Sequence, residues 1–560
     1  MYARENIEQK LREGLRQAAE KACEAGDFSL NGQELPEIEL EVPREREFGD
    51  YSTNLAMQLP KIARKAPRQI AEALAGRFEP IPGVVETVEI AGPGFINFRL
   101  DPSWLTQIVA QVNEMGGDYG KTARHAGKTY NLEFISANPT GPMHMGNARG
   151  GAIGDVLAEL AEWTGYDVTR EFYVNDAGNQ IEKFGDSLDA RFRQLTGEDF
   201  PFPEDGYQGE DITEHVKEYL AEHPGSEEEL KAQPPEQRRK IFIDYALKKN
   251  LERMHSDLAD YGIQYDVWFS EQSLYETGAI DKALDMLKKS GSVYEEDGAV
   301  WFRTTDYGCE KDDVLIRQNG IPTYYMGDIA YHLNKFETRG FDRGVNVWGA
   351  DHHGHIARLQ AALDAAGAGG KLDVVIMQLV KLVQDGEIVK MSKRTGKMIT
   401  LTDLIQMIGK DAARFFFNLR SPDSHFEFDL DLAIRESNEN PVFYVQYAHA
   451  RICSILRQAE GFDWSDADLS LLGEPEEIAL MEVLSRFYEE IQAGEEKMDP
   501  SRITRYAVDL ASAFHTFYNA VRVNTDEIEL KKARFALISA VRQVLRNASE
   551  ILGINAPERM

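Results

Sequence analysis

A histidine stands in a turn rich in proline and glycine, in the stretch from Asn138 to Asn147 (NPTGPMHMGN). The prolines and glycines leave no room for regular strand pairing there. An apolar run at residues 132–135 precedes the turn and is typical of a short buried strand, and apolar residues at helical spacing follow it from 152 to 160. Because free backbone N–H groups and the helix dipole both face such a turn, it is suited to binding an anion. The histidine and the small residues around it favour nucleotide phosphates.

A second stretch, KMSKRTGK, carries four cations, which are Lys390, Lys393, Arg394 and Lys397. Like charges this close repel one another, so they stay exposed unless an anion joins them. Taken alone, the stretch fits a solvated basic loop better than a binding site. Together with the histidine-bearing turn, it predicts a clamp that closes around a polyphosphate.

A third stretch, Val345 to His355 (VNVWGADHHGH), holds three histidines in four residues and invites a zinc interpretation. Catalytic zinc usually takes three protein ligands from distant elements. No HExxH pattern or cysteine pair supports such a site here. Because the stretch reads as a strand that ends in a glycine turn, Asp351 is better placed to hold a ribose hydroxyl.

Acidic and polar side chains also surround the first turn. Glu133, Ser136 and Asn138 stand at the carboxyl end of the predicted strand, where open α/β sheets bind ligands. Tyr324 and Asp328 are four residues apart and share one face if their segment is helical. Two carboxylates, an amide and a phenol could hold a cationic ligand, although solvated acids and a core tyrosine would give the same pattern.

The elements that must position these residues follow from the apolar pattern. Strand-like runs at 132–135, 168–173, 345–348 and 374–377 alternate with helical patterns, which predicts a parallel sheet with crossover helices. We assign residues 126–410 to this Rossmann-like catalytic domain, with an insertion at about 184–300. The first part of the insertion, about 184–240, is acidic and rich in proline and glycine, which is typical of a surface segment.

Two further domains flank the predicted sheet domain. A helix at 4–25 and strand-like alternation at 38–42 and 94–100 predict a small α+β N-terminal domain over residues 1–118. Amphipathic helical patterns run from 411 to 560 and predict an all-α C-terminal bundle. The predicted fold class is therefore multidomain α/β, built from these three parts.

Composition limits the class of protein. The 560 residues are 42% apolar and 28% charged, which is typical of a soluble globular chain with more than one core. No apolar run is long enough to span a membrane, and the first residues lack a signal-peptide core. Three scattered cysteines form no disulfide framework, so we expect a cytoplasmic protein. The net charge of −32 counts against nucleic-acid binding unless local basic stretches provide it.

The motifs PMHMGN and KMSKR, in this order, resemble the paired ATP motifs of the class I aminoacyl-tRNA synthetases. The surrounding sequence narrows this to the arginyl-tRNA synthetase family. The motifs that carry the narrower resemblance are EFISANPTGPMHMGNARG, YQGE, PTYYMGDIAYH, YAHARI, FGDYSTN and AGPGFINF. The resemblance covers essentially the whole chain. It implies that arginine reacts with ATP to give arginyl-adenylate and pyrophosphate, and that arginine then passes to tRNA(Arg) with release of AMP.

The resemblance also implies which residues form the site. The expected catalytic groups at the phosphates are His144, Asn147, Lys390 and Lys393. The expected ATP-binding residues are Pro142, His144, Gly146, Asn147, Gly349, Asp351, His355, Met391, Ser392 and Lys393. The expected arginine-binding residues are Glu133, Ser136, Asn138, Tyr324, Asp328 and His352, and the expected tRNA-binding residues are Tyr444, Tyr447, Arg451, Tyr518 and Arg522. ATP is expected to enter with Mg²⁺ as a substrate complex, with no resident metal, no tightly bound cofactor and no membrane partner. The protein is expected to be a monomer.

One position departs from the family pattern. Asn147 stands where the second histidine of HxGH is expected, and an amide can donate a hydrogen bond but carries no charge. Because the KMSKR motif is intact, we interpret position 147 as one that orients the turn and does not need to carry a charge. Two alternatives remain at this point. One is a catalytically silent tRNA-binding paralogue. The other is a small-molecule nucleotidyltransferase, a class that lacks a long helical C-terminal domain.

Overall fold

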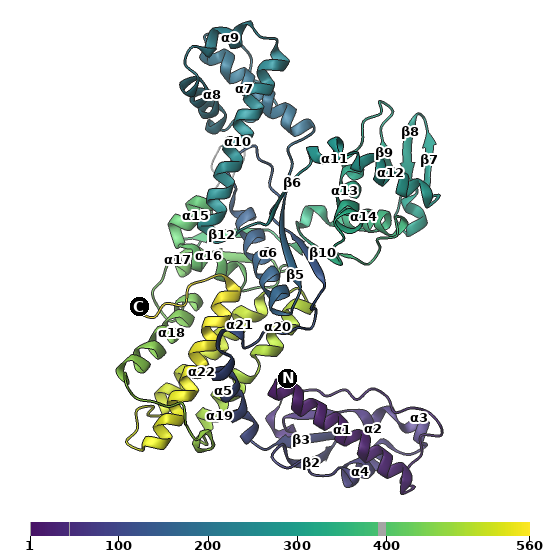
Figure 1. The fold of residues 1–560 in the computed structure, drawn as a ribbon, viewed down its shortest axis with the longest axis vertical. Coiled ribbons are helices and arrows are strands. Elements are labelled where there is room, and N and C mark those ends of the chain that lie inside the picture. Colours follow the sequence, from purple (N-terminus) through teal and green to yellow (C-terminus); the bar gives the residue numbers. More distant parts are fainter. Residues whose placement is uncertain (1, 44, 390–398) are drawn as a thin grey trace.

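A five-stranded parallel sheet lies at the centre of the computed structural model, which describes residues 2–43, 45–389 and 399–560 (Figure 1). Its strands are β4 (Thr129–Glu133), β5 (Asp167–Val174), β6 (Val267–Ser270), β10 (Arg343–Gly349) and β11 (Leu372–Met377). The order across the sheet is β11-β10-β4-β5-β6, with every pair parallel. Because β4 comes first in the chain and lies inside the sheet, the winding direction reverses between β4 and β10. Open α/β sheets bind their ligands at the carboxyl ends beside such a reversal.

The four runs predicted as strands all lie in this sheet, which confirms the predicted fold class. β6 was not predicted, because residues 184–300 were assigned to an insertion. Its pairing with β5 makes it an edge strand of the main sheet, so the inserted material lies in two parts on either side of it.

Helices cover the sheet and build the two inserted parts. These helices are α6 (Met145–Trp163), α7 (Asn179–Leu195), α8 (Glu210–Glu222), α9 (Ser226–Ala232), α10 (Pro235–Tyr261), α11 (Gln272–Glu276), α12 (Ala279–Lys289), α13 (Tyr324–Leu333) and α14 (His353–Ala365). The second inserted part also holds an antiparallel sheet of β7 (Val293–Glu296), β8 (Ala299–Phe302) and β9 (Asp313–Ile316). Helices α7 to α10 project at one end of the molecule, where α7, α8 and α10 pack around an apolar cluster of their own (Figure 1).

The N-terminal domain lies at the opposite end (Figure 1). Its elements are α1 (Ala3–Glu24), β1 (Tyr51–Thr53), α2 (Leu55–Gln58), α3 (Pro60–Ala63), α4 (Pro67–Arg77), β2 (Val85–Ala91) and β3 (Phe95–Leu100). The strands form an antiparallel sheet in the order β1-β3-β2. The strand predicted at 38–42 is wrong, since that segment makes only an isolated bridge between Glu41 and Ser52. Helix α5 (Ser103–Met115) then packs against the C-terminal bundle.

A small sheet joins the central domain to the bundle. It consists of β12 (Val380–Gln384), β13 (Glu387–Ile388) and β14 (Phe426–Asp429), and the helices α15 (Leu401–Ile408), α16 (Lys410–Phe417) and α17 (Leu430–Ala433) accompany it. β14 lies beyond residue 411, where the sequence indicated helices alone. Its apolar residues Phe426 and Phe428 alternate with polar ones, and it pairs in parallel with β12.

The remaining chain is the helical bundle. Its helices are α18 (Pro441–Gln458), α19 (Pro475–Ser485), α20 (Phe487–Glu496), α21 (Ser501–Ala520) and α22 (Ile528–Leu552). Their apolar faces belong to the same buried cluster as the main sheet and the N-terminal domain, so the three parts share one core. Among the described residues no helix is long and apolar enough to cross a bilayer.

Candidate active site

The side chains of His144 and Asn147 close the first turn of α6. His144 is the N-cap in an extended conformation, and its Nδ1 accepts the backbone N–H of Gly146 at 3.1 Å. The backbone N–H of His144 donates to Asn147 Oδ1 at 2.9 Å, which completes a capping box. Because Nδ1 is an acceptor, the neutral imidazole carries its proton on Nε2 and can donate from there. The amide of Asn147 therefore holds the turn in shape.

The chain that leads into this turn is under backbone strain. Ile135 and Ser136 have φ values of 65° and 43°, a region that residues other than glycine rarely adopt. Such outliers persist where surrounding contacts fix them and are frequent at functional sites. Gly154 of α6 lies against Phe134, where a Cβ would overlap the ring, so the helix packs directly on the end of β4.

The chain just after the lysine-rich stretch pairs with this same turn. Lys390, Met391, Ser392 and Lys393 lie outside the described residues. The chain that follows them pairs with the turn: Met145 N–H donates to the Ile399 carbonyl at 3.2 Å, and Leu401 N–H donates to the Met143 carbonyl at 2.9 Å. Residues 399–401, which follow the stretch in the chain, are thus fixed beside His144.

Arg149 of α6 holds the small sheet of β12 and β14, which precedes the lysine-rich stretch and follows it in the chain. Its guanidinium is fully buried and donates to the backbone carbonyls of Gln378 (2.5 Å), Ser421 (3.3 Å) and Ser424 (3.2 Å). No carboxylate forms an ion pair with it in the described chain, and burial lowers its pKa to about 10. These carbonyls flank β12 and β14, so Arg149 fixes the small sheet from which the lysine-rich stretch leaves.

A buried hydrogen-bond network lies under the turn. Lys335 Nζ is fully buried, lies 2.8 Å from Glu133 Oε2 and donates to Asn346 Oδ1 at 3.2 Å. Ser136 Oγ donates to Glu133 Oε1 at 3.0 Å. The carboxylate of Glu133 is therefore already paired with a cation. In this geometry it orients Ser136 and Lys335, and its predicted contact with arginine stays a prediction.

Asp328 lies at the end of a second network, which comes from α13 and α14. His355 Nε2 donates to Asp328 Oδ2 at 2.7 Å, because Arg358 donates to His355 Nδ1 at 3.0 Å and fixes the tautomer. Arg358 itself is held by Asp313 at 2.9 Å. Burial, followed by the charge of Lys335, lowers the pKa of the neighbouring His332 to about 3, so that ring stays neutral. His355, predicted as an ATP ligand, here orients Asp328.

Glu271, which sequence reasoning missed, faces this network from the carboxyl end of β6. It is 5% exposed, and no described cation forms an ion pair with it. Burial, then the charges of Asp328 and Asp176, raise the pKa of Glu271 to about 7. Burial, then the charges of Glu271, Asp328 and Glu133, raise the pKa of Tyr173. The available signal was the run Val267-Trp268-Phe269-Ser270 with an acid directly after it, since acids at strand carboxyl ends often bind ligands.

The other predicted site residues lie around the same edge of the sheet. Gly349 ends β10, and the side chains of Asp351 and His352 just beyond it are 84% and 57% exposed. Tyr324 begins α13 and is 56% exposed, which leaves its ring open to a ligand. Asn138 Nδ2 donates to Gln180 at 2.5 Å.

The predicted tRNA-binding residues form one surface on α18 and α21. The Arg451 guanidinium lies 4.6 Å from the ring centroid of Tyr447 and 5.2 Å from that of Tyr518. Tyr444 lies one turn before Tyr447, and Arg522 is exposed just beyond α21. Aromatic rings beside arginines are suited to splayed bases and phosphates of a nucleic-acid loop.

Comparisons with known proteins agree along the whole chain. Three family models match: "Arginyl tRNA synthetase N terminal domain" over residues 7–100, "tRNA synthetases class I (R), catalytic domain" over 107–418, and "DALR anticodon binding domain" over 445–560. The chain is 56% identical to an arginine–tRNA ligase of Caldanaerobacter subterraneus subsp. tengcongensis, over 99% of this chain and 100% of the relative. It is 51% identical to that of Acetivibrio thermocellus, over 99% of both chains. The solved arginyl-tRNA synthetase of Thermus thermophilus has the same fold, with a TM-score of 0.75 at 24% identity over 98% of this chain and all of that one.

Proposed function

This chain belongs to the arginyl-tRNA synthetase family, and we propose that the site at the carboxyl edge of its sheet joins L-arginine to tRNA(Arg) using ATP. Arginine and ATP first form arginyl-adenylate and pyrophosphate. A ribose hydroxyl at the end of the tRNA then attacks the adenylate carbonyl, and AMP leaves. Nothing supports the silent paralogue, whose only argument was Asn147.

One observation carries the proposal, which is the backbone pairing of residues 143–145 with residues 399–401. It places Ile399, the first described residue after the lysine-rich stretch, beside the histidine-bearing turn. We therefore place a triphosphate at the N-terminus of α6, within reach of both stretches. Lys390 and Lys393 would then neutralise the phosphate oxygens that His144 and the helix N–H groups do not reach.

The chemistry of the first step needs charge stabilisation more than proton transfer. The arginine carboxylate is already ionised at neutral pH and attacks the α-phosphorus in line, so no general base is required. Negative charge grows on the equatorial and leaving oxygens, and each well-placed donor in such a site is typically worth about 3 kcal/mol. His144 Nε2–H, Lys390 and Lys393 are the proposed donors. Mg²⁺ would arrive with ATP, which with water supplies most of its ligands.

We assign the guanidinium of arginine to Glu271 and Asp328. Both carboxylates lie at the edge of the sheet beside Tyr324, and the charge of Asp328 reaches Glu271. A planar guanidinium can pair with two carboxylates in a bidentate manner that a lysine ammonium cannot copy. An amino acid that left these acids half-paired would be rejected strongly.

The surface of Tyr447, Arg451 and Tyr518 is proposed to bind the anticodon loop. Tyr447→Ala is expected to weaken tRNA affinity by about 1–3 kcal/mol, because one stacking platform is lost. Its effect on arginine affinity should be negligible, since α18 is remote from the sheet edge. Filter binding of tRNA(Arg) and calorimetric titration of arginine measure the two quantities. Loss of arginine affinity with unchanged tRNA affinity would contradict this assignment.

Asn147 is proposed to supply geometry and no charge. Asn147→Ala removes the capping acceptor and should cost about 1 kcal/mol of stability. Asn147→Asp keeps an acceptor for the His144 N–H but adds a negative charge beside the phosphates. Pyrophosphate exchange should therefore be slower in the aspartate variant than in the alanine variant by about tenfold. Equal rates in the two variants would mean that the side chain lies away from the phosphates.

Pyrophosphate exchange with arginine, run with and without tRNA(Arg), tests the whole proposal. Exchange that depends on arginine supports it, and the comparison with and without tRNA(Arg) shows whether activation also depends on the tRNA. No exchange in either case supports a silent paralogue, and exchange driven by another acid supports a different nucleotidyltransferase. A monomeric state and a cytoplasmic location are parts of the same proposal, and sedimentation analysis checks the first.

A further inference from the structure

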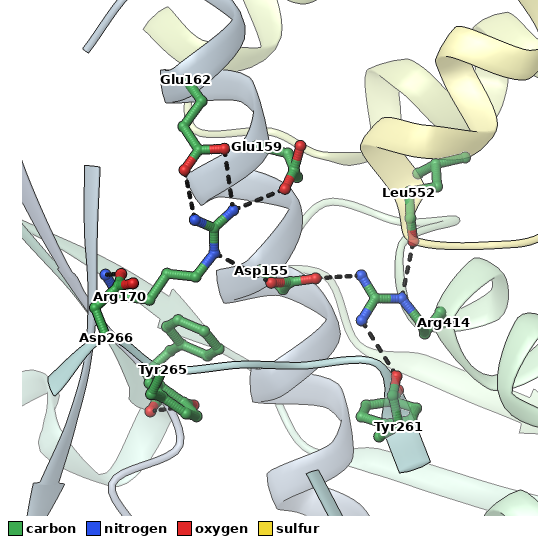
Figure 2. Close-up of polar contacts among 10 residues, drawn as sticks. Asp155, Glu159, Glu162, Arg170, Tyr261, Tyr265, Asp266, Arg414 and Leu552 are labelled. Carbon is green, nitrogen blue, oxygen red and sulfur yellow. Dashed lines mark hydrogen bonds and ion pairs between the residues drawn. The ribbon is translucent and has the colours of Figure 1, made fainter. Parts of the chain in front are cut away.

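Arg414 of α16 lies where three other helices meet (Figure 2). Its guanidinium is fully buried and contacts Asp155 of α6 through Nη2 at 2.5 Å. Nε donates to the carbonyl of Leu552, the last residue of α22, at 2.9 Å. Nη1 donates to the carbonyl of Tyr261, the last residue of α10, at 3.4 Å. A cation at two helix C-termini and against one carboxylate is a stable arrangement, and it joins three distant segments at one group.

Two routes lead from Arg414 to the helix that carries the phosphate site. Asp155 lies on α6 itself, three turns after His144, and a helix transmits a shift along its axis as a rigid unit. The second route runs through Tyr261, whose hydroxyl donates to the carbonyl of Ala148 at 3.1 Å, one residue after Asn147. A change in the position of Arg414 is therefore expected to change the position of the first turn of α6.

Asp155 is also held from the sheet side. Arg170 of β5 lies 3.4 Å from Asp155, 2.7 Å from Glu159 and 2.5 Å from Glu162, all of them on α6 (Figure 2). The carboxylate of Asp155 is thus shared between a guanidinium of the sheet and one at the end of the bundle. If Arg414 shifted, its contact with Asp155 would change, while Arg170 would still pair with the Asp155 carboxylate.

The end of α22 packs closely against the Arg414 guanidinium. Gly553 follows Leu552 with a φ of +63°, and a Cβ on it would overlap the Arg414 guanidinium. α22 packs along α18 and α21, the helices that carry the proposed tRNA surface. A displacement of α22 along its axis would therefore change the contact between Gly553 and the Arg414 guanidinium.

We propose that Arg414 is a positioning residue that fixes the first turn of α6 relative to the end of α22. This rests on the proposed function. Arg414 touches no substrate. It acts through Asp155 and Tyr261 on the placement of His144.

Gly553→Ala tests this without changing any charge. The added methyl group displaces the guanidinium, and a small misplacement at a reaction centre can slow a reaction by about 10- to 100-fold. We expect kcat of tRNA-dependent pyrophosphate exchange to fall by at least about tenfold, while the Kd for tRNA(Arg) and the KM for ATP change by less than about twofold. Gly26→Ala is the matched control, because Gly26 also follows a helix, has a φ of +79° and has nothing within 4 Å. It imposes the same backbone strain and should leave kcat unchanged.

Arg414→Lys keeps the charge and provides a second test of the inference if Gly553→Ala folds poorly. It should lower kcat in the same way, and adding Gly553→Ala to it should cause no further loss, since the glycine acts only through the guanidinium. An unchanged kcat in Gly553→Ala, or fully multiplied losses in the double variant, would overturn the inference. Absence of arginine-dependent exchange in the unmutated chain would instead overturn the proposed function, and that measurement comes first.

Discussion

Glu271→Gln is expected to raise the KM for arginine about a hundredfold in pyrophosphate exchange. The substitution keeps the size of the side chain but removes one of the two charges proposed to pair with the guanidinium. Hydrogen bonds between charged groups are worth about 1.5–3 kcal/mol each, and the guanidinium left half-paired in a buried site loses more than one of them. kcat at saturating arginine should change less, because Glu271 lies away from the phosphates. Glu276→Gln, the same change at an exposed carboxylate of α11, is the control and should have no effect.

The pH dependence of arginine binding provides a second check on Glu271. Because burial and the neighbouring acids raise the pKa of Glu271 to about 7, it holds a proton below that pH in the free protein. The guanidinium requires the anion, so arginine affinity should fall as the pH drops, by about tenfold per unit below 7. The glutamine variant carries no such proton and should show a flatter profile between pH 6 and 8. Calorimetric titration measures both, and parallel profiles would contradict the assignment.

The parts of this fold with a strong local signal were predictable. Buried strands such as 374–377 are continuous apolar runs, and the turn before α6 is marked by proline and glycine, so the parallel sheet and the turn that begins α6 followed from the sequence. Tyr324 and Asp328 were expected to share a face if helical, and α13 begins at Tyr324.

The partners of the site residues could not be predicted, because they come from distant segments. Nothing near Glu133 in the sequence indicates that Lys335 will be buried against it. The strand β6 is only four residues long and lies within a polar region, so its acid Glu271 gave no periodic signal. Only the tertiary arrangement distinguishes an acid that orients its neighbours from one left for a ligand.

Replacing His144 should give the second large effect. His144→Ala removes both the cap of α6 and the Nε2–H donor, and we expect pyrophosphate exchange to slow by about 10²- to 10³-fold. His144→Asn separates the two roles, because asparagine is a good N-cap residue but lacks a donor at the reach of Nε2. If the phosphate contact matters most, the asparagine variant should be nearly as slow as the alanine variant at unchanged thermal stability. If His144→Asn exchanged pyrophosphate at a rate close to that of the unmutated chain, His144 would serve only as a helix cap.

The pair His144 and Lys393 then tests whether one triphosphate joins the two stretches. Lys393→Ala should slow adenylate formation by a similar factor with little change in tRNA affinity, because the lysine would act on phosphate oxygens that exist only in the ATP complex. Residues that stabilise the same charge act as a unit, so the double variant His144→Asn/Lys393→Ala should lose less than the product of the single losses. Independent losses would mean that the two side chains serve separate steps. Because residues 143–145 and 399–401 pair through their backbones, that pairing survives both substitutions, and the coupling measured would belong to the side chains and the phosphates between them.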